Sequence, residues 1–376
     1  MPPPANLEVS PAYCLRLRHK GSSCRLCLKG CPTDAISLGE SLAVDNSLCD
    51  GCGICASVCP TGVFELKDLP YESLPARVRK GSVVEFACSR VRPSRDTVTV
   101  PCLGYLDEAV LIATIGHGAQ AVSLNFAACR RCENKSGLRV AVKSLKKANR
   151  MLALLGIPKM ISATSGGLAG SHSAEGSEPS SRREFLSYLK EGARGMVASA
   201  VDGTPSDRKT SARTKVTLEP KLPKKRSLLL EHIKALNPPP SNWVKADGLP
   251  FVRVEISDRC DGCGICTTFC PTGALKSCDQ GDRQVIDFKL GYCLACNLCS
   301  DICPQGAIAY SSHINPHHLA TAARTILIEH RKSTCSQCGQ SYIALSGSSL
   351  CLNCRKEKGL KEWLINMAST SGGEID

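Results

Sequence analysis

The stretch CDGCGICASVCP at residues 49–60 decides the fold of the N-terminal part of the chain, and it returns almost unchanged as CDGCGICTTFCP at residues 260–271. Each copy is accompanied by another cysteine run that also ends in Cys-Pro, at residues 14–32 and 293–304. Two-residue gaps let a tight loop aim three thiolates at one point, and the spacing C-x-x-C-x-x-C-x-x-x-C-P is typical of 4Fe-4S binding. The sixteen cysteines of the four runs therefore predict four 4Fe-4S clusters and a role in electron transfer.

The runs resemble the bacterial two-cluster ferredoxins over residues 10–70 and 250–312. The resemblance implies that the last cysteine of each run binds the cluster of the other run. The expected ligand sets are quartet 1 (Cys31, Cys49, Cys52, Cys55), quartet 2 (Cys14, Cys24, Cys27, Cys59), quartet 3 (Cys260, Cys263, Cys266, Cys303) and quartet 4 (Cys270, Cys293, Cys296, Cys299). One run departs from the family, because nine residues separate Cys14 from Cys24 in place of two. Disulfides or zinc sites are the alternative, but they do not repeat a Cys-Pro ending.

A short hairpin is expected in each ferredoxin-like module. Apolar alternation around Gly39 and Glu40 predicts strands at 36–38 and 42–44. The second module repeats this pattern around residues 279–282. Cys278 would then lie on the first strand of that hairpin as a packed core thiol.

Residues 80–165 have a different character, since strand patterns alternate with helix patterns. The expected elements are strands at 83–87, 97–100 and 121–126 and helices at 106–115 and 138–155, the last ending at Gly156. The carboxyl ends of strands in an open parallel sheet share one edge, where such folds bind ligands. Four cysteines should converge there, the middle quartet Cys88, Cys102, Cys129 and Cys132.

The same segment resembles the iron-sulfur delta subunit of methyl-viologen-reducing hydrogenases. The resemblance rests on Phe86-Ala87-Cys88, Pro101-Cys102-Leu103-Gly104, Gly118-Ala119, Cys129-x-x-Cys132 and the closing Leu154-Leu155-Gly156-Ile157. It implies a 2Fe-2S cluster at the middle quartet and partners among hydrogenases, formate dehydrogenases and heterodisulfide-reductase-like proteins of anaerobic metabolism. Val91 stands where that family usually has a second cysteine, and the third motif lacks the family's longer spacing. A zinc site or reduced core thiols are the alternatives.

The C-terminal cysteines form two further pairs, twelve residues apart. Cys335-x-x-Cys338 and Cys351-x-x-Cys354, the ribbon quartet, have the spacing of a zinc ribbon whose hairpin would turn at Gly347. Rubredoxin-type iron is the alternative. The lysines and arginines around this site, Arg331, Lys332, Arg355, Lys356, Lys358 and Lys361, form either a solvated face or a docking face for an acidic partner.

Residues 166–245 have the composition of a flexible basic linker with short helices. Serine and glycine dominate at 162–181, and eight lysines or arginines stand against one acid at 208–226. The segment SRREFL at 181–186 resembles a twin-arginine export motif, but no apolar region follows it, so we expect a short docking helix there. Another helix is expected at 228–236.

Together these segments predict an α+β protein. Two ferredoxin-like dicluster domains, residues 1–75 and 246–315, flank a small doubly wound α/β domain at 80–165 and the linker at 166–245. A helix and the zinc ribbon follow at 316–376. No apolar run reaches the roughly 20 residues of a membrane span, and the N-terminus lacks a signal peptide's regions. Cluster thiolates need a reducing compartment, so we expect a cytoplasmic protein with no membrane span.

Charge and motifs limit the function classes. The formal net charge is +13, but six thiolate-bound metal sites of about −2 each would bring it near +1, so most of the basicity balances metal sites. Dinucleotide, P-loop and nucleophile-elbow motifs are missing from the sequence. We therefore expect a non-catalytic electron-transfer subunit of an oxidoreductase complex that binds no nucleic acid. An iron- or redox-sensing nucleic-acid-binding protein and a thiol-disulfide enzyme are the alternatives.

Overall fold

The computed structural model describes residues 7–158, 161–165, 219–237, 243–321, 323–343 and 348–370. All of them belong to one of the two units into which the chain divides. The predicted segment SRREFL and the predicted turn at Gly347 lie outside the described residues. In the described ranges, no helix combines the length and the apolar character needed to cross a membrane.

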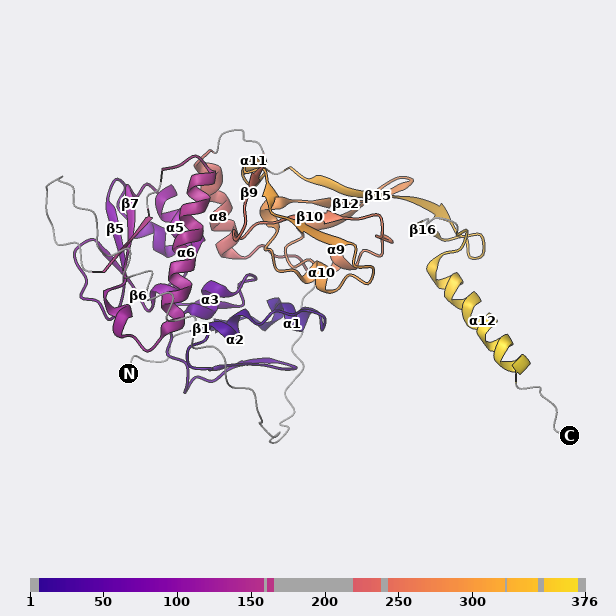
Figure 1. Ribbon diagram of the computed structural model, residues 1–376, viewed down its shortest axis with the longest axis horizontal. Coiled ribbons are helices and arrows are strands. Elements are labelled where there is room, and N and C mark those ends of the chain that lie inside the picture. The colour runs from indigo at the N-terminus through magenta and orange to yellow at the C-terminus, as the bar shows by residue number, and fades with distance from the viewer. Residues whose placement is uncertain are drawn as a thin grey trace. The chain divides into compact units, whose positions relative to one another are not determined.

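The N-terminal module is built from two small antiparallel strand pairs and several short helices (Figure 1). Its elements are β1 (Leu7–Val9) paired with β4 (Phe64–Leu66), the hairpin β2 (Ile36–Leu38) and β3 (Leu42–Val44), η1 (Pro11–Tyr13), α1 (Leu15–Arg18), α2 (Leu26–Gly30), α3 (Ile54–Val58) and α4 (Ser73–Ala76). The predicted hairpin at 36–44 is confirmed. The apolar residues Ile36, Leu42 and Phe64 are buried and place the sheets against the cysteine loops.

The C-terminal module repeats this plan and extends it. Its elements are β10 (Arg253–Ile256) paired with β13 (Ile308–Ser311), β11 (Leu275–Gln280), β12 (Arg283–Phe288), α9 (Ile265–Phe269), η4 (Leu290–Tyr292), α10 (Leu298–Asp301), β15 (Thr325–Thr334), β16 (Ser341–Ile343) and α12 (Leu352–Thr370). The predicted hairpin is β11 and β12, and β15 and β16 continue it into a four-stranded sheet. Cys278 lies on the first strand of this hairpin as expected, but it is not a packed core thiol: it is only half-buried, and its Sγ lies 3.5 Å from Oδ2 of Asp287.

The middle domain is a parallel sheet of four strands in the order β6-β5-β7-β8. Its elements are β5 (Val83–Cys88), β6 (Thr97–Val100), η2 (Leu103–Tyr105), α5 (Glu108–Gly116), β7 (Ala121–Asn125), η3 (Ala127–Arg131), α6 (Lys135–Leu154) and β8 (Ile161–Thr164). Fully buried side chains of the sheet and the helices, such as Phe86, Leu124, Ile112 and Leu152, form its core. The N-terminal end of α6 is capped by Asn134, whose Oδ1 accepts a hydrogen bond from Gly137 N.

Both helices between the strands of this sheet cover the same face, whereas helices on both faces are expected for a doubly wound domain. The crossovers from β6 through α5 to β7 and from β7 through α6 to β8 step in the same direction across the sheet. Right-handed connections of this kind place both helices on the same face. Accordingly α5 and α6 contact each other and lie on one side of β5 and β7 (Figure 1). The connection from β5 to β6 (residues 89–96) contains no helix and steps in the opposite direction, so the strand order reverses as in a doubly wound sheet although both helices lie on one face.

A helix inside the predicted linker is part of the packed structure. Helix α8 (Lys224–Ala235) contacts α5 and α11 (His317–Ala320), and Leu229 and Ile233 on it are buried. Close to it, β9 (Val244–Lys245) pairs with β14 (His313–Ile314). The helix expected at 228–236 is therefore found, as part of α8, but residues 219–237 and 243–245 are not the flexible linker that was predicted, because apolar side chains such as Leu229 and Ile233 are buried. The remainder, 166–218 and 238–242, lies outside the described residues.

Candidate iron-sulfur and metal centres

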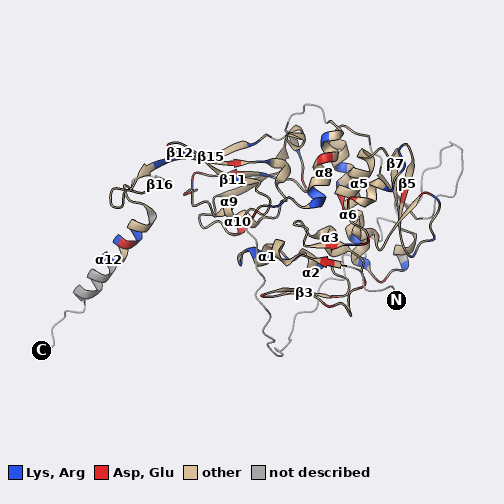
Figure 2. Cartoon of the chain, turned by 180° about the vertical axis from the view of Figure 1, so that it is seen from behind, with Lys and Arg blue, Asp and Glu red and all other residues tan. Residues whose placement is uncertain are grey.

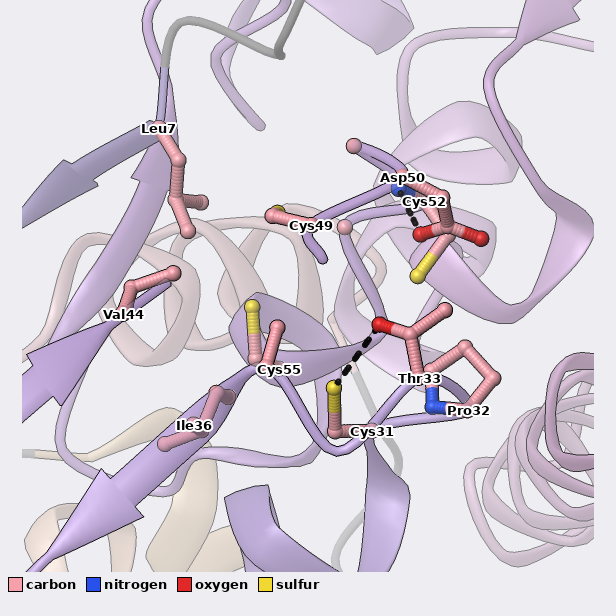
Figure 3. A pocket seen from close by; sticks show the side chains of 13 residues that line it. Leu7, Cys31, Pro32, Thr33, Ile36, Val44, Cys49, Asp50, Cys52 and Cys55 are labelled. Atoms are coloured by element: carbon pink, nitrogen blue, oxygen red, sulfur yellow. Dashed lines mark hydrogen bonds between the residues drawn. The ribbon is translucent and has the colours of Figure 1, made fainter. Parts of the chain in front are cut away.

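The cysteines of quartet 1 line one small cavity in the N-terminal module. Figure 3 shows the thiols of Cys31, Cys52 and Cys55 around this cavity, with the apolar side chains of Ile36 and Val44 beside it. Two short loops supply the thiols, because α2 ends before Cys31 and α3 carries Cys55. The loop at 49–55 turns through two glycines, at 51 and 53, with φ values of 69° and 74°, a conformation that favours glycine.

The other three quartets have the same arrangement. Quartets 2, 3 and 4 each line a separate small cavity. Each cavity takes three cysteines from one run and the fourth from the other run, in the crossed grouping expected from the sequence. Cys14, on the irregular run, is 8% exposed and lines the cavity of quartet 2.

The donor set in each cavity fits a positively charged cluster. Burial, together with the thiols of Cys49 and Cys31, raises the pKa of Cys55 to about 12. Burial and the thiols of Cys59, Cys14 and Cys24 raise the pKa of Cys27 to about 12 as well. Crowded thiols of this kind stay neutral unless a cation compensates for their ionised form. Four thiols around a largely apolar cavity therefore match the needs of a metal cluster.

Threonine hydroxyls beside the sulfurs are a feature that the sequence reasoning missed. Three of the four runs continue as Cys-Pro-Thr. The Oγ1 atoms of Thr33, Thr61 and Thr272 lie 3.7, 3.6 and 3.8 Å from the Sγ atoms of the cysteines two residues before them. The repeated threonine was a visible signal. Because hydrogen bonds to cluster sulfurs set reduction potentials, these hydroxyls are candidate tuning groups.

The middle quartet gathers at the carboxyl edge of the parallel sheet. Cys88 ends β5, Cys102 follows β6, and Cys129 lies on η3 after β7. Burial raises the pKa of Cys129 to about 12, and the thiols of Cys88, Cys102 and Cys132 add to the shift. The Cys102 sulfur accepts a hydrogen bond from Gly104 N at 3.4 Å. The convergence of all four cysteines at one sheet edge is as predicted.

The ribbon quartet is closed around one point. Its four Sγ atoms all lie within 4.8 Å of one another, with 3.8 Å between those of Cys338 and Cys351. Backbone N–H groups, first that of Cys351 at 3.3 Å, lower the pKa of Cys335 to about 6. Such tight tetrahedral thiol sites are typical of a single zinc ion. Within the described residues, no other group of His, Cys, Asp or Glu side chains is this close, so the five other quartets are more open than a mononuclear site.

Neighbouring quartets adjoin one another within the N-terminal and middle parts. Burial raises the pKa of Cys52 in quartet 1, and the Cys102 thiol of the middle quartet contributes to that shift. The shift at Cys55 likewise includes a contribution from Cys59 of quartet 2. The contact between these parts is close, since the side-chain Oγ of Ser57 donates to the carbonyl oxygen of Gly104 at 2.7 Å. The middle quartet, quartet 1 and quartet 2 therefore form a continuous series.

The series continues into the C-terminal module. Cys24 of quartet 2 and Cys296 of quartet 4 pack against the same buried apolar cluster. Burial raises the pKa of Cys266 in quartet 3 to about 12, and Cys299 of quartet 4 is the first of the thiols that add to it. The order in space is thus the middle quartet, then quartets 1, 2, 4 and 3. Cys263, at the far end in quartet 3, is exposed.

The site and the fold define an iron-sulfur protein of electron transport that carries 4Fe-4S clusters. Three family models match parts of the chain: the LdpA Fe-S cluster-binding domain at 21–68, the 4Fe-4S dicluster domain at 259–307, and the methyl-viologen-reducing hydrogenase delta subunit at 85–165. The two modules thus match two different families although their motifs are nearly identical. The first match begins after Cys14, and the other two include all the predicted cluster ligands of their segments. No curated protein is similar enough to match the chain.

Proposed function

We propose that this protein is an electron-transfer subunit that relays electrons within or between oxidoreductases, with hydrogenase, formate dehydrogenase or heterodisulfide-reductase-like proteins as partners. The observation that carries the proposal is the continuous series of five open thiol quartets through the described structure. When bound, the clusters supply one-electron redox chemistry. The similarity of residues 85–165 to a hydrogenase delta subunit supports the choice of partners.

The role of the chain's own residues is to hold, shield and tune the clusters. Quartets 1 to 4 would hold 4Fe-4S clusters, the middle quartet a 2Fe-2S cluster, and the ribbon quartet zinc. Apolar side chains around the thiols exclude water, and backbone N–H groups such as those of Val63 and Ala307 donate to Cys59 and Cys303 at 3.5 and 3.4 Å. The middle quartet lies at one end of the series, next to quartet 1, so we place the docking of a hydrogenase-like partner at the middle domain.

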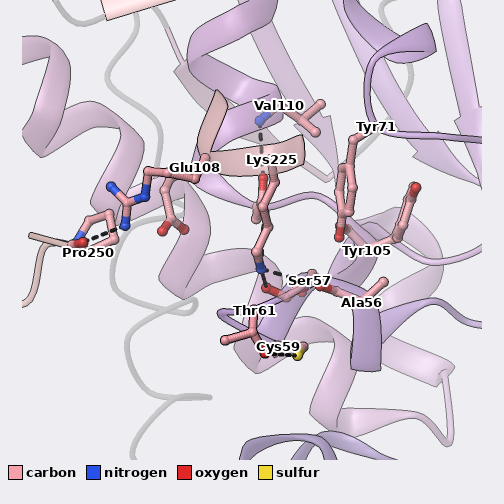
Figure 4. Close-up of polar contacts among 12 residues, drawn as sticks. Ala56, Ser57, Cys59, Thr61, Tyr71, Tyr105, Glu108, Val110, Lys225 and Pro250 are labelled. Carbon is pink, nitrogen blue, oxygen red and sulfur yellow. Dashed lines mark hydrogen bonds and ion pairs between the residues drawn. The ribbon is translucent and has the colours of Figure 1, made fainter. Parts of the chain in front are cut away.

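The basic residues at the start of α8 have partners inside the chain; Figure 2 shows Lys and Arg in blue on this helix. Lys224 pairs with Glu65 at 2.8 Å. Lys225 donates to the carbonyl oxygen of Ser57 at 2.8 Å (Figure 4). Arg226 donates to the carbonyl oxygen of Pro250 at 2.7 Å. These contacts account for the basic residues at 224–226 without a nucleic acid, so the relay is favoured over the nucleic-acid-binding alternative.

Metal and sulfide analysis of the full-length protein, purified without oxygen, tests the proposal. We expect about 18 iron and one zinc per chain, visible absorbance and uptake of reducing equivalents. About 16 iron and two zinc per chain would place zinc in the middle quartet and would leave the proposed electron relay through the four 4Fe-4S clusters intact. A colourless protein that accepts no electrons would refute the proposed function, and co-purification without any oxidoreductase subunit would refute the proposed partners.

A further inference from the structure

The nine residues between Cys14 and Cys24 form a segment that leaves the N-terminal module and contacts the C-terminal module. We call residues 15–23 the docking segment. Arg18 Nε donates to the carbonyl oxygen of Phe269 at 3.0 Å, and the ring of His19 packs edge-on against Phe269 at 4.7 Å between centroids. Ser23 donates through N and Oγ to Oδ2 of Asp301, at 3.0 and 2.8 Å. The irregular spacing thus coincides with a specific contact between the modules.

An apolar cluster lies beneath these polar contacts. Leu15 from the docking segment and Leu298 and Ile302 from the C-terminal module are 2%, 1% and 8% exposed and pack together. Cys24 and Cys296 pack against this cluster from either side. A regular two-residue gap after Cys14 would remove most of this contact, and with it the surface that brings quartets 2 and 4 together.

Two arginines on α1 are associated with two different quartets. Arg18 is 5% exposed, and the thiols of Cys270 and Cys296 in quartet 4 act on it electrostatically. Arg16 acts instead on Cys14 and Cys24 in quartet 2. A positive charge beside a cluster favours its reduced, more negative state, and burial weakens the screening of that charge by water. Arg18 therefore places a charge from one module beside the metal site of the other.

We propose that the docking segment joins the two modules so that quartets 2 and 4 adjoin. The positive charge of Arg18, placed across this contact, raises the reduction potential of the cluster held by quartet 4. The tuning of the reduction potential by Arg18 rests on the proposed function, because it requires a bound cluster. The docking itself depends only on the contacts of residues 15–23.

Redox titration of the full-length protein, followed by electron paramagnetic resonance, tests the role of Arg18. Signals of quartets 2 and 4 are assigned beforehand with Cys24→Ser and Cys296→Ser. In Arg18→Gln we expect the reduction equilibrium constant at quartet 4 to fall about tenfold, which is about 59 mV for a one-electron couple. Arg18→Lys, which keeps the charge, should stay close to the wild type. Arg16→Gln should shift quartet 2 and leave quartet 4 unchanged.

The outcomes separate this inference from the proposed function. A protein that binds no clusters would overturn the proposed function. A fully loaded protein in which Arg18→Gln and the wild type have equal potentials at quartet 4 would overturn only the tuning role. An equal fall of the reduction potential at quartet 4 in Arg18→Gln and Arg18→Lys would show that Arg18 matters for its hydrogen bond and not for its charge. This result would also overturn the tuning role.

Hydrogen–deuterium exchange tests the docking without a redox readout. Asp301→Asn weakens the bonds from Ser23, so we expect faster amide exchange at residues 15–23 and 298–302. The matched control is Ser47→Ala, which removes a similar serine–aspartate hydrogen bond, to Asp45, within the N-terminal module. Exchange in Asp301→Asn that equals the control at both segments would overturn the docking.

Discussion

At the scale of single residues, the threonines of the Cys-Pro-Thr runs fall into two groups. A metal-bound thiolate carries no proton, so the hydroxyls of Thr33 and Thr61 must be the donors toward sulfur. The hydroxyl of Thr272 has already donated its proton to the carbonyl oxygen of Tyr292 at 2.7 Å. A hydroxyl has one proton, so Thr272 cannot donate to Cys270 as well. The same motif is therefore expected to have two effects.

Valine at these threonine positions should separate the two effects. Thr61→Val is expected to lower the reduction potential at quartet 2, because it removes a hydrogen bond worth about 1 kcal/mol from the sulfur. Thr272→Val is expected to leave the potential at quartet 4 unchanged and to lower the free energy of unfolding by a similar ~1 kcal/mol. Redox titration and chemical denaturation measure both quantities. Equal potential shifts in the two variants would contradict this assignment.

Gly137 is a residue whose role follows from the position of one sulfur. A Cβ atom at Gly137 would lie 2.5 Å from the Sγ of Cys102, closer than any real contact. Gly137→Ala should therefore displace Cys102 and lower the metal content of the middle quartet, by about two iron atoms if it holds a 2Fe-2S cluster. The control is Gly39→Ala, where a Cβ would meet nothing within 4 Å. Unchanged iron content in Gly137→Ala would argue against cluster binding at Cys102.

The sequence predicts the cysteines much better than their surroundings. Each ligand set follows from local spacing and from the ferredoxin resemblance, and the structure brings together the same residues. Arg18 carries no local signal, because its role depends on Phe269 and quartet 4, about 250 residues further along the chain. The hydroxyls of Thr33 and Thr61 could have been found, since threonine follows three of the four Cys-Pro pairs.

At the scale of elements, α8 shows why composition misled the prediction of a linker. Lys224, Lys225 and Arg226 resemble a solvated basic run, but their partners Glu65, Ser57 and Pro250 come from other parts of the chain. The face of the middle sheet that α5 and α6 cover could not be predicted either, because it depends on the order of the strands in the sheet. Lengths and periods of elements are local properties, and their pairing is not.

A substitution on α8 distinguishes a packed helix from a flexible linker. Ile233 is fully buried, so Ile233→Ala should lower the free energy of unfolding by about 2–5 kcal/mol. Glu231→Ala, on the exposed side of the same helix, should change it by less than about 0.5 kcal/mol. Chemical denaturation of both variants measures the difference. Equal stabilities would mean that residues 224–235 do not pack as described.

The ribbon quartet is expected to bind its metal independently of the four 4Fe-4S sites. Strand β16 and the ribbon quartet lie at the end of the four-stranded sheet, and a Cβ at Gly262 in the quartet 3 loop would meet Ile343 of β16. Cys354→Ser should remove about one zinc per chain and keep about 18 iron. Metal analysis measures both values. Loss of iron from quartets 1 and 2 in this variant would contradict the separation of the two kinds of site.

At the scale of the whole molecule, the middle quartet and quartets 1 to 4 form a line of candidate cluster sites through the part of the protein that the structure describes. The two ferredoxin-like modules are far apart in the sequence, and the docking segment and α8 bring them together with the middle domain. The order of quartets assigns the two ends to different surroundings, with the hydrogenase-like domain at one end and the exposed Cys263 at the other. Such an arrangement suits transfer between two partners.

The central claim is that four crossed cysteine quartets hold 4Fe-4S clusters that accept electrons. Mössbauer spectroscopy of full-length protein with isotopically enriched iron, before and after reduction with dithionite, tests it most directly. The account predicts that about 16 of about 18 iron atoms per chain have the spectrum of 4Fe-4S clusters and that reduction changes it. A spectrum of mononuclear iron, or a cluster spectrum that dithionite leaves unchanged, would contradict the claim.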